Sequence, residues 1–219
     1  MCGFTPYVFS MFCDIYVKST DCGQAAVNRF REETLSSLKI DREKKIHTRD
    51  IKIATFAYDD AHIIVEGELN DNRIIPAFSH KGDLYPPGNI HHMFIRLLIE
   101  IDSIRIVQVE IEMPGIPHEE CPETIPRFAQ LEGLRIAPGF TSKVRNIIGG
   151  PKGCAHLSGL LMAMASAALQ GLWTYRAKDR HQADKDITEI ANAYLINTCW
   201  VWRRDGPLVD SLSKEYEIS

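Results

Sequence analysis

Apolar and polar residues alternate through the first half of the chain, beginning near Lys45, as they do in strands that bury one face. The segments that show this alternation are 46–56, 62–69, 73–78, 90–101 and 104–111. The turn-tolerant residues Asn70-Asp71-Asn72 separate the second segment from the third, which predicts a hairpin there. Another turn is expected at Asp102-Ser103. Strands with such short connections predict an antiparallel β-meander.

The pattern changes to a helical period in the second half. Apolar side chains recur at steps of three and four residues over 152–175, which predicts a helix with one buried stripe. That stripe consists of Leu157, Leu160, Leu161, Met164, Ala168, Leu172 and Tyr175. A second helix is predicted over 184–202, and the proline-rich segment 113–139 is expected to be a loop. A meander followed by two covering helices is an α+β fold.

Residues 1–44 lack such a pattern, so we expect a poorly patterned N-terminal leader followed by a single α+β domain over residues 45–219. The chain has 219 residues, of which 45% are hydrophobic, and this is enough for one substantial core. The apolar stretch 7–17 is interrupted by Asp14 and has no basic segment before it, so no signal peptide is predicted. We therefore expect a cytoplasmic protein whose six cysteines are reduced.

Charge and composition exclude several classes of protein. The formal net charge of −4 provides no basic face for nucleic acid. No uninterrupted apolar run approaches the roughly 18 residues of a membrane helix, so we expect no membrane partner. P-loop, dinucleotide-binding and HExxH motifs are missing from the sequence. A homo-oligomer or a protein partner is compatible with this composition.

Cys154 has the sequence setting most typical of a reactive or metal-binding thiol. It follows Gly149-Gly150-Pro151-Lys152-Gly153 and begins the first predicted helix, where free N–H groups and the helix dipole stabilise a thiolate. His156 comes two residues later, so the two side chains can converge beyond the helix end. The simpler interpretations are a small residue at a helix cap for Cys154 and a surface histidine for His156.

Three further residues are candidates for the same site. Cys121 lies in a loop bounded by prolines rather than in an apolar run. Cys199 falls on the apolar stripe of the second predicted helix, where packing alone would also explain it. His91 is predicted to point inward from the strand 90–101, where its ring nitrogens need either a hydrogen-bond partner or a metal.

The order of several motifs resembles a bacterial family catalogued as a domain of unknown function, whose hallmark is Gly-Cys-Thr-His-Leu after a glycine pair. The segments that carry the resemblance are Ile90-His91-His92-Met93, Glu110-Ile111-Glu112-Met113-Pro114, Cys121-Pro122, Gly133-Leu134-Arg135-Ile136-Ala137-Pro138-Gly139-Phe140, Gly153-Cys154-Ala155-His156-Leu157 and Asn197-Thr198-Cys199. The resemblance implies that the family usually has the same residue types at His91, Cys121, Cys154, His156 and Cys199. Ala155 departs from the usual Thr, and Trp200 stands where a His is common. No established activity comes with this family.

These residues favour a metal centre. A Cys₃His set binds structural zinc, and thiolates also hold iron–sulfur clusters. We therefore predict that Cys121, Cys154 and Cys199 bind zinc or an iron–sulfur centre together with His156 or His91. One alternative is an acyl- or thiol-transfer enzyme with Cys154 as nucleophile and His91 or His156 as base, for which the sequence assigns no orienting Asp or Asn. Another is a non-catalytic interaction protein in which the cysteines merely pack.

Overall fold

The computed structural model describes residues 38–178, 188–216 and 218. The chain divides into two compact units, Met1–Lys45 and Ile46–Ser219. In the described part of the first unit, a short 3-10 helix, η1 (Arg42–Lys44), begins where the Asp41 carboxylate accepts a hydrogen bond from the Glu43 N–H. Most of the predicted leader lies outside the described residues.

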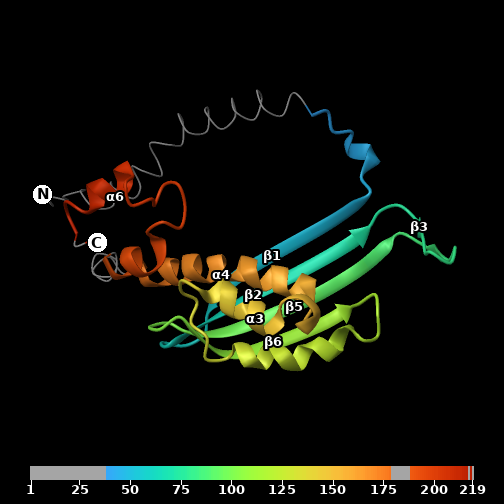
Figure 1. Cartoon of the computed structure of the whole chain (residues 1–219), viewed down its shortest axis with the longest axis horizontal. Coiled ribbons are helices and arrows are strands. Elements are labelled where there is room, and N and C mark those ends of the chain that lie inside the picture. Colours follow the sequence, from blue (N-terminus) through green and yellow to red (C-terminus); the bar gives the residue numbers. More distant parts are fainter. Residues whose placement is uncertain (1–37, 179–187, 217, 219) are drawn as a thin grey trace, which may run out of the picture. The chain divides into compact units, whose positions relative to one another are not determined.

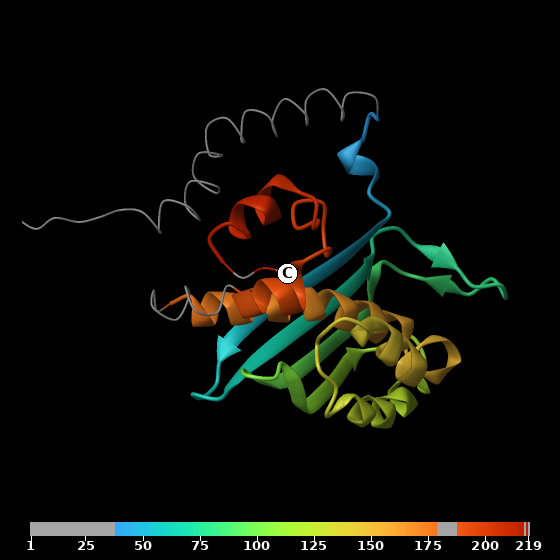
Figure 2. The same cartoon turned by 60° about the vertical axis from the view of Figure 1, so that its left-hand side comes forward.

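A four-stranded antiparallel sheet is the centre of the second unit (Figure 1). Its strands, in spatial order, are β1 (His47–Ala57), β2 (His62–Arg73), β5 (Gly88–Glu100) and β6 (Arg105–Gly115). A small hairpin of β3 (Ala77–Phe78) and β4 (Leu84–Tyr85) is inserted between β2 and β5 and projects from one end of the sheet (Figure 2). Apart from this insertion, each strand pairs with the next one in the chain, which confirms the predicted antiparallel meander and the α+β fold.

Helices cover one face of this sheet (Figure 1). They are the 3-10 helix η2 (Cys121–Leu131), α3 (Phe140–Ile148), the 3-10 turn η3 (Gly150–Lys152) and the long helix α4 (Ala155–Arg176). The predicted stripe of α4 is confirmed, because Leu157, Leu160, Leu161, Met164, Ala168 and Leu172 are all buried. Among the described residues, α4 is also the one helix with the length and composition of a membrane span. About a third of that apolar window, 33%, is buried in the described structure.

Two glycines set how closely α4 approaches the sheet. A Cβ atom on Gly67 of β2 would lie 2.5 Å from the sulfur of Met164, and one on Gly171 of α4 would lie 2.3 Å from Oγ1 of Thr55 on β1. Both distances are shorter than any normal contact with a Cβ atom. The atom that a Cβ on Gly67 would meet belongs to the flexible end of Met164, whereas a Cβ on Gly171 would also lie 2.5 Å from the Cβ of Thr55, so the spacing between the helix and the sheet depends mainly on Gly171.

The predicted turn at Asn70-Asp71-Asn72 is wrong. β2 runs without interruption to Arg73 and pairs with β1 along that whole length. The chain leaves the sheet only after Arg73, just before Pro76, which has no N–H to continue a ladder. Hydrogen bonds from neighbouring strands satisfy the polar side chains of this segment, so their preference for turns does not decide its structure.

The proline-rich segment 113–139 is ordered and partly helical rather than only a loop. The 3-10 helix η2 occupies the middle of this segment and buries Phe128 and Leu131 against the core. Pro122 lies in its first turn, where a missing N–H leaves no helical hydrogen bond unmade. The helix α3 that follows was not predicted. Its nine residues bury Phe140, Val144 and Ile148.

The second predicted helix, 184–202, is too long. Residues 184–187 lie outside the described part of the chain, and the helical residues that follow end at Leu195, the last residue of the π-helical turn η4 (Ala191–Leu195). Asn197 then adopts a positive φ of 61°, which a continuing helix does not allow. Cys199 is consequently exposed in a turn, and its predicted place on a buried stripe is wrong. A short helix, α6 (Pro207–Leu212), follows.

Candidate functional site

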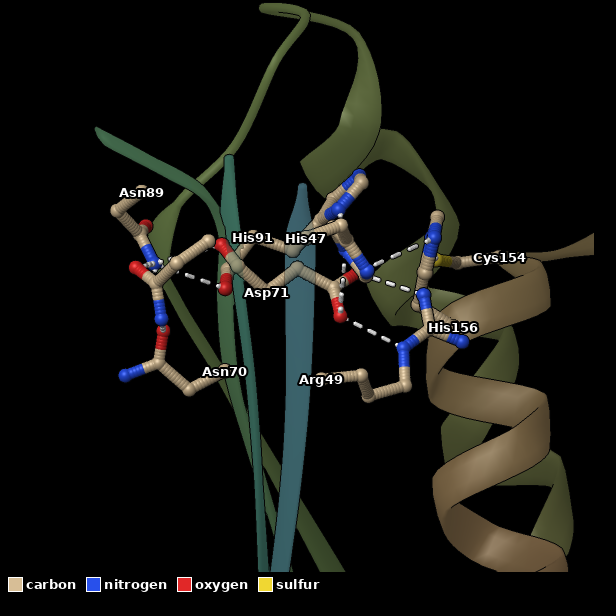
Figure 3. A network of polar contacts seen from close by, with 9 residues as sticks. His47, Arg49, Asn70, Asp71, Asn89, His91, Cys154 and His156 are labelled. Atoms are coloured by element: carbon tan, nitrogen blue, oxygen red, sulfur yellow. Dashed lines mark hydrogen bonds and ion pairs between the residues drawn. The ribbon is translucent and has the colours of Figure 1, made fainter. Parts of the chain in front are cut away.

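The candidate site lies where the inner face of the sheet changes from apolar to polar. On β2, Asp71 comes two residues after the buried Leu69, and on β5, His91 comes two residues before the buried Met93. Arg49 pairs with Asp71 across β1 and β2, and Asp71 pairs with His91 across β2 and β5. Residues two apart on a strand share a face, so these polar side chains form a row beside the start of α4 (Figure 3).

Asp71 is the centre of this row. Its side chain is only 2% exposed, and Arg49 donates to both of its oxygens, with 2.6 Å from Nε to Oδ1 and 2.6 Å from Nη2 to Oδ2. This two-bond pairing offsets the cost of burying a carboxylate. The hydrogen bonds from Arg49 are the largest reason why the pKa of Asp71 lies below its ordinary value. The carboxylate is therefore charged at neutral pH.

Two histidines meet at the same carboxylate oxygen. His91 Nδ1 lies 3.1 Å from Asp71 Oδ2, and His156 Nε2 lies 3.8 Å from it. The two imidazole rings lie against each other with their centroids 3.7 Å apart. One ligand atom from each of Asp71, His91 and His156 lies within 4.8 Å of the other two. A metal ion with bonds of about 2 Å would need only small side-chain shifts to bind all three.

The glycine-rich segment between α3 and α4 places Cys154 and His156 at this site. Gly150 has a φ of 59°, in the left-handed region that favours glycine. At Gly153, a Cβ atom would lie 2.5 Å from the carbonyl oxygen of Ile148, so the chain could not turn as closely with a side chain there. Cys154 then precedes the first turn of α4, and its Sγ lies 3.8 Å from His156 Nδ1 (Figure 3).

His156 has the protonation behaviour of a ligand or a base. Burial is the largest reason why its pKa lies below the ordinary value, and the neighbouring His91 and Arg49 lower it further, whereas Asp71 acts in the opposite direction. The imidazole is consequently neutral at pH 7, with one nitrogen free to bind a metal or accept a proton.

Asn89 holds the backbone of the site from the other side. Its amide nitrogen donates to Asn70 Oδ1 at 2.7 Å and to the carbonyl oxygens of Asp71 and His91 at 3.2 and 3.1 Å. The pairing of β2 with β5 shifts register between Asp71 and Asn72, as at a β-bulge. Asn89 thus ties together the two strands from which Asp71 and His91 project (Figure 3).

The structure brings together only part of the predicted ligand set. His91, Cys154 and His156 lie at the site, with His91 facing inward as expected. Cys121 is half-buried at the first residue of η2, and Cys199 is exposed. Within the described ranges, the group of side chains close enough to share a metal consists of Asp71, His91 and His156, and the three cysteines do not form such a group.

Asp71 and Arg49 belong to the site although neither was predicted from the sequence. The available signal was the alternation along β2, where Ile63, Val65 and Leu69 occupy the inner face. Continuing this alternation by two residues places Asp71 on the same face. The turn preference of the neighbouring asparagines obscured this continuation.

The fold and the site define a class of α+β protein in which a core helix begins over an Asp–His–His cluster at one end of an antiparallel sheet. Residues 47–170 match a family described as "Protein of unknown function (DUF2889)". Because this match covers more than half of the 219 residues, the chain belongs to that family, as the motif resemblance predicts. The matched region includes Asp71, His91, Cys154 and His156 but not Cys199. No curated protein and no solved structure matches the chain.

The lowered pKa of Asp71 predicts how the stability of the metal-free protein changes in acid. A carboxylate whose pKa falls on folding stabilises the protein fully above its unfolded pKa of about 3.9, and this stabilisation is lost as the pH falls through the folded pKa. We expect the wild type to be more stable than Asp71→Asn by about 2 kcal/mol near pH 7 and to lose this advantage in acid. Urea unfolding of both proteins at a series of pH values, from neutral to acidic, measures this difference in stability. A difference that does not change with pH would contradict the assignment.

Proposed function

We propose that the protein binds a zinc ion through Asp71, His91 and His156, with Cys154 next to this ligand set but outside it. The observation that carries the proposal is the spacing of the three ligand atoms, all within 4.8 Å of one another at a buried carboxylate. Two imidazoles and one carboxylate are a ligand set that zinc uses in sites where water or a substrate completes the coordination.

The protonation states at the site support a metal. Metal binding requires a charged carboxylate and neutral imidazoles. The lowered pKa of Asp71 and the lowered pKa of His156 both favour these forms at neutral pH. Asn89 donates hydrogen bonds to the backbone carbonyl oxygens of Asp71 and His91 and so fixes the two strands that carry these ligands.

The composition of the cluster favours zinc over an iron–sulfur centre. Iron–sulfur clusters are held mainly by cysteine thiolates. Of the three predicted cysteine ligands, only Cys154 is in contact with the cluster, through His156. Two histidines and a carboxylate also bind iron(II) in some oxygenases. The experiment below therefore has to identify the metal as well as measure its amount.

Metal analysis of the purified protein tests the proposal. We expect roughly one zinc ion per chain, and we expect His156→Ala to lower zinc affinity by more than about tenfold, because the loss of a ligand outweighs the loss of a group that only orients one. His80→Ala is the matched control, since His80 is exposed in the turn that connects β3 to β4. Mass spectrometry of the metal content and titration against a zinc chelator measure both effects. A wild type that binds no metal, or equal affinities in the two variants, would overturn the proposal.

A second candidate function is cysteine-dependent acyl or thiol transfer with Cys154 as the nucleophile. In its favour, Cys154 Sγ lies 3.8 Å from His156 Nδ1, and His156 Nε2 lies 3.8 Å from Asp71 Oδ2. In such a triad the histidine accepts the thiol proton and the carboxylate orients the histidine. The second distance is longer than a hydrogen bond, so this triad would have to tighten when a substrate binds, which places this function second.

Alkylation of Cys154 distinguishes the two functions. Iodoacetamide labelling, located by mass spectrometry, is compared in the presence of zinc and of a chelator, with the exposed Cys199 as an internal control. A zinc ion bound by His156, the neighbour of Cys154, predicts slower labelling of Cys154 in the presence of zinc, while Cys199 is labelled equally in both conditions. A nucleophile predicts that Cys154 is labelled faster than Cys199 well below pH 8.5, with or without zinc.

A further inference from the structure

We infer that Arg49 competes with the metal for Asp71, so that the proposed zinc site exchanges its ion instead of holding it permanently. This inference rests on the proposed function and assigns a regulatory role to a residue outside the ligand set. Arg49 holds the buried carboxylate with two hydrogen bonds, and zinc has to displace it or share the carboxylate with it.

The first observation is that one oxygen serves all the groups concerned. Asp71 Oδ2 accepts the hydrogen bond from Arg49 Nη2 at 2.6 Å. The same oxygen lies 3.1 Å from His91 Nδ1 and 3.8 Å from His156 Nε2. A zinc ion bound by these three ligands would therefore lie next to a guanidinium group that already uses this oxygen. Two cations this close in a partly buried site repel each other.

The second observation is that the two partners differ in their freedom to move. The Asp71 side chain is 2% exposed, whereas that of Arg49 is 43% exposed and projects from β1, an edge strand of the sheet. The Arg49 side chain can therefore rotate into the solvent and remain hydrated, whereas the Asp71 carboxylate is buried and cannot reach water. Since a buried carboxylate without a partner is costly, an arginine that leaves when zinc arrives keeps Asp71 paired in both states.

The remaining charged and titratable groups around Asp71 do not replace Arg49. His47 Nε2 lies 3.7 Å from Asp71 Oδ1. Unlike an arginine, a histidine carries a positive charge only when it is protonated. Arg49 is thus the permanent cation at the carboxylate among the described contacts of Asp71. Its removal changes the competition without removing a proposed ligand.

A purely orienting role for Arg49 makes the opposite prediction. Outer groups that orient metal ligands increase affinity, and their mutation typically weakens metal binding by about 10- to 100-fold. A competing cation lowers affinity, so its mutation strengthens binding. The direction of the change in zinc affinity therefore separates the two roles.

Zinc affinity of the whole protein is measured by competition with a chromophoric chelator at pH 7.5 for the wild type, Arg49→Gln, Arg49→Lys and the control Arg105→Gln. Arg105 on β6 forms an ion pair with Glu100 on β5, and its side chain is 49% exposed, close to the exposure of Arg49. We expect Arg49→Gln to bind zinc about tenfold more tightly or better, and to release it more slowly to excess chelator. Arg49→Lys keeps the positive charge but cannot donate two parallel hydrogen bonds to the carboxylate, so its zinc affinity should lie between those of Arg49→Gln and the wild type. Arg105→Gln should match the wild type.

The outcomes distinguish a failure of the competition by Arg49 from a failure of the zinc site itself. Arg49→Gln binding equal to or weaker than the wild type would overturn the competition while leaving the zinc site intact. A wild type that binds no zinc would overturn the proposed function and this inference together. Circular dichroism of each variant checks folding. If Arg49→Gln does not fold, the direction of the change in Arg49→Lys decides by the same criterion.

Discussion

Asp71→Asn is expected to lower zinc affinity by roughly 100-fold or more, the largest effect of any single substitution at the site. The substitution removes the one negative charge among the proposed ligands, and an amide oxygen is a much weaker ligand for zinc than a carboxylate. Competition titration with a chromophoric chelator measures the change.

Asp50→Asn is the matched control for this prediction. Asp50 is exposed on β1, next to Arg49 in the chain, and its side chain projects from the opposite face of the strand. It should bind zinc with wild-type affinity. If Asp71→Asn also binds zinc like the wild type, the metal is held elsewhere and the proposed site is wrong.

Gly171→Ala is expected to destabilise the protein by about 2 kcal/mol, although alanine is the better helix former. A Cβ atom at this position would lie 2.3 Å from Oγ1 and 2.5 Å from Cβ of Thr55, and the latter atom is fixed to the β1 backbone. Relief of this overlap requires α4 to move away from the sheet. Urea unfolding followed by circular dichroism measures the loss of stability.

Gly159→Ala makes the same substitution in the same helix with the opposite expected sign. Nothing lies within 4 Å of a Cβ atom at Gly159, so the change should stabilise the protein by about 0.5–1 kcal/mol through helix propensity alone. Equal effects at the two glycines would show that the close approach of α4 to β1 does not exist.

The link between these two sets of predictions is α4. Its apolar stripe holds it on the sheet, and its first residues bring Cys154 and His156 to the row of Arg49, Asp71 and His91. The site therefore depends on where the helix begins relative to the end of the sheet. Packing along the whole length of α4 sets the geometry of the residues at its N-terminus.

Much of the fold follows from local patterns. Alternation predicts the strands of the meander and the inward face of His91, and steps of three and four residues predict the stripe of α4. Such patterns are reliable because one buried face leaves few arrangements for a strand or helix of this length. The glycines before Cys154 likewise predict a tight turn into the helix.

The sequence by itself thus determined the antiparallel meander, the helix α4 with its buried stripe, and two of the three members of the Asp–His–His cluster. Only the tertiary structure decided that Asp71 lies in a strand, that Arg49 neutralises it, and that Cys121 and Cys199 stay out of the cluster. The reason is that local preferences assign Asp71 to a turn, and pairing with β1 and β5 overrules them. Which distant side chains meet is set by strand register and by the position of α4, and neither can be read from residue spacing alone.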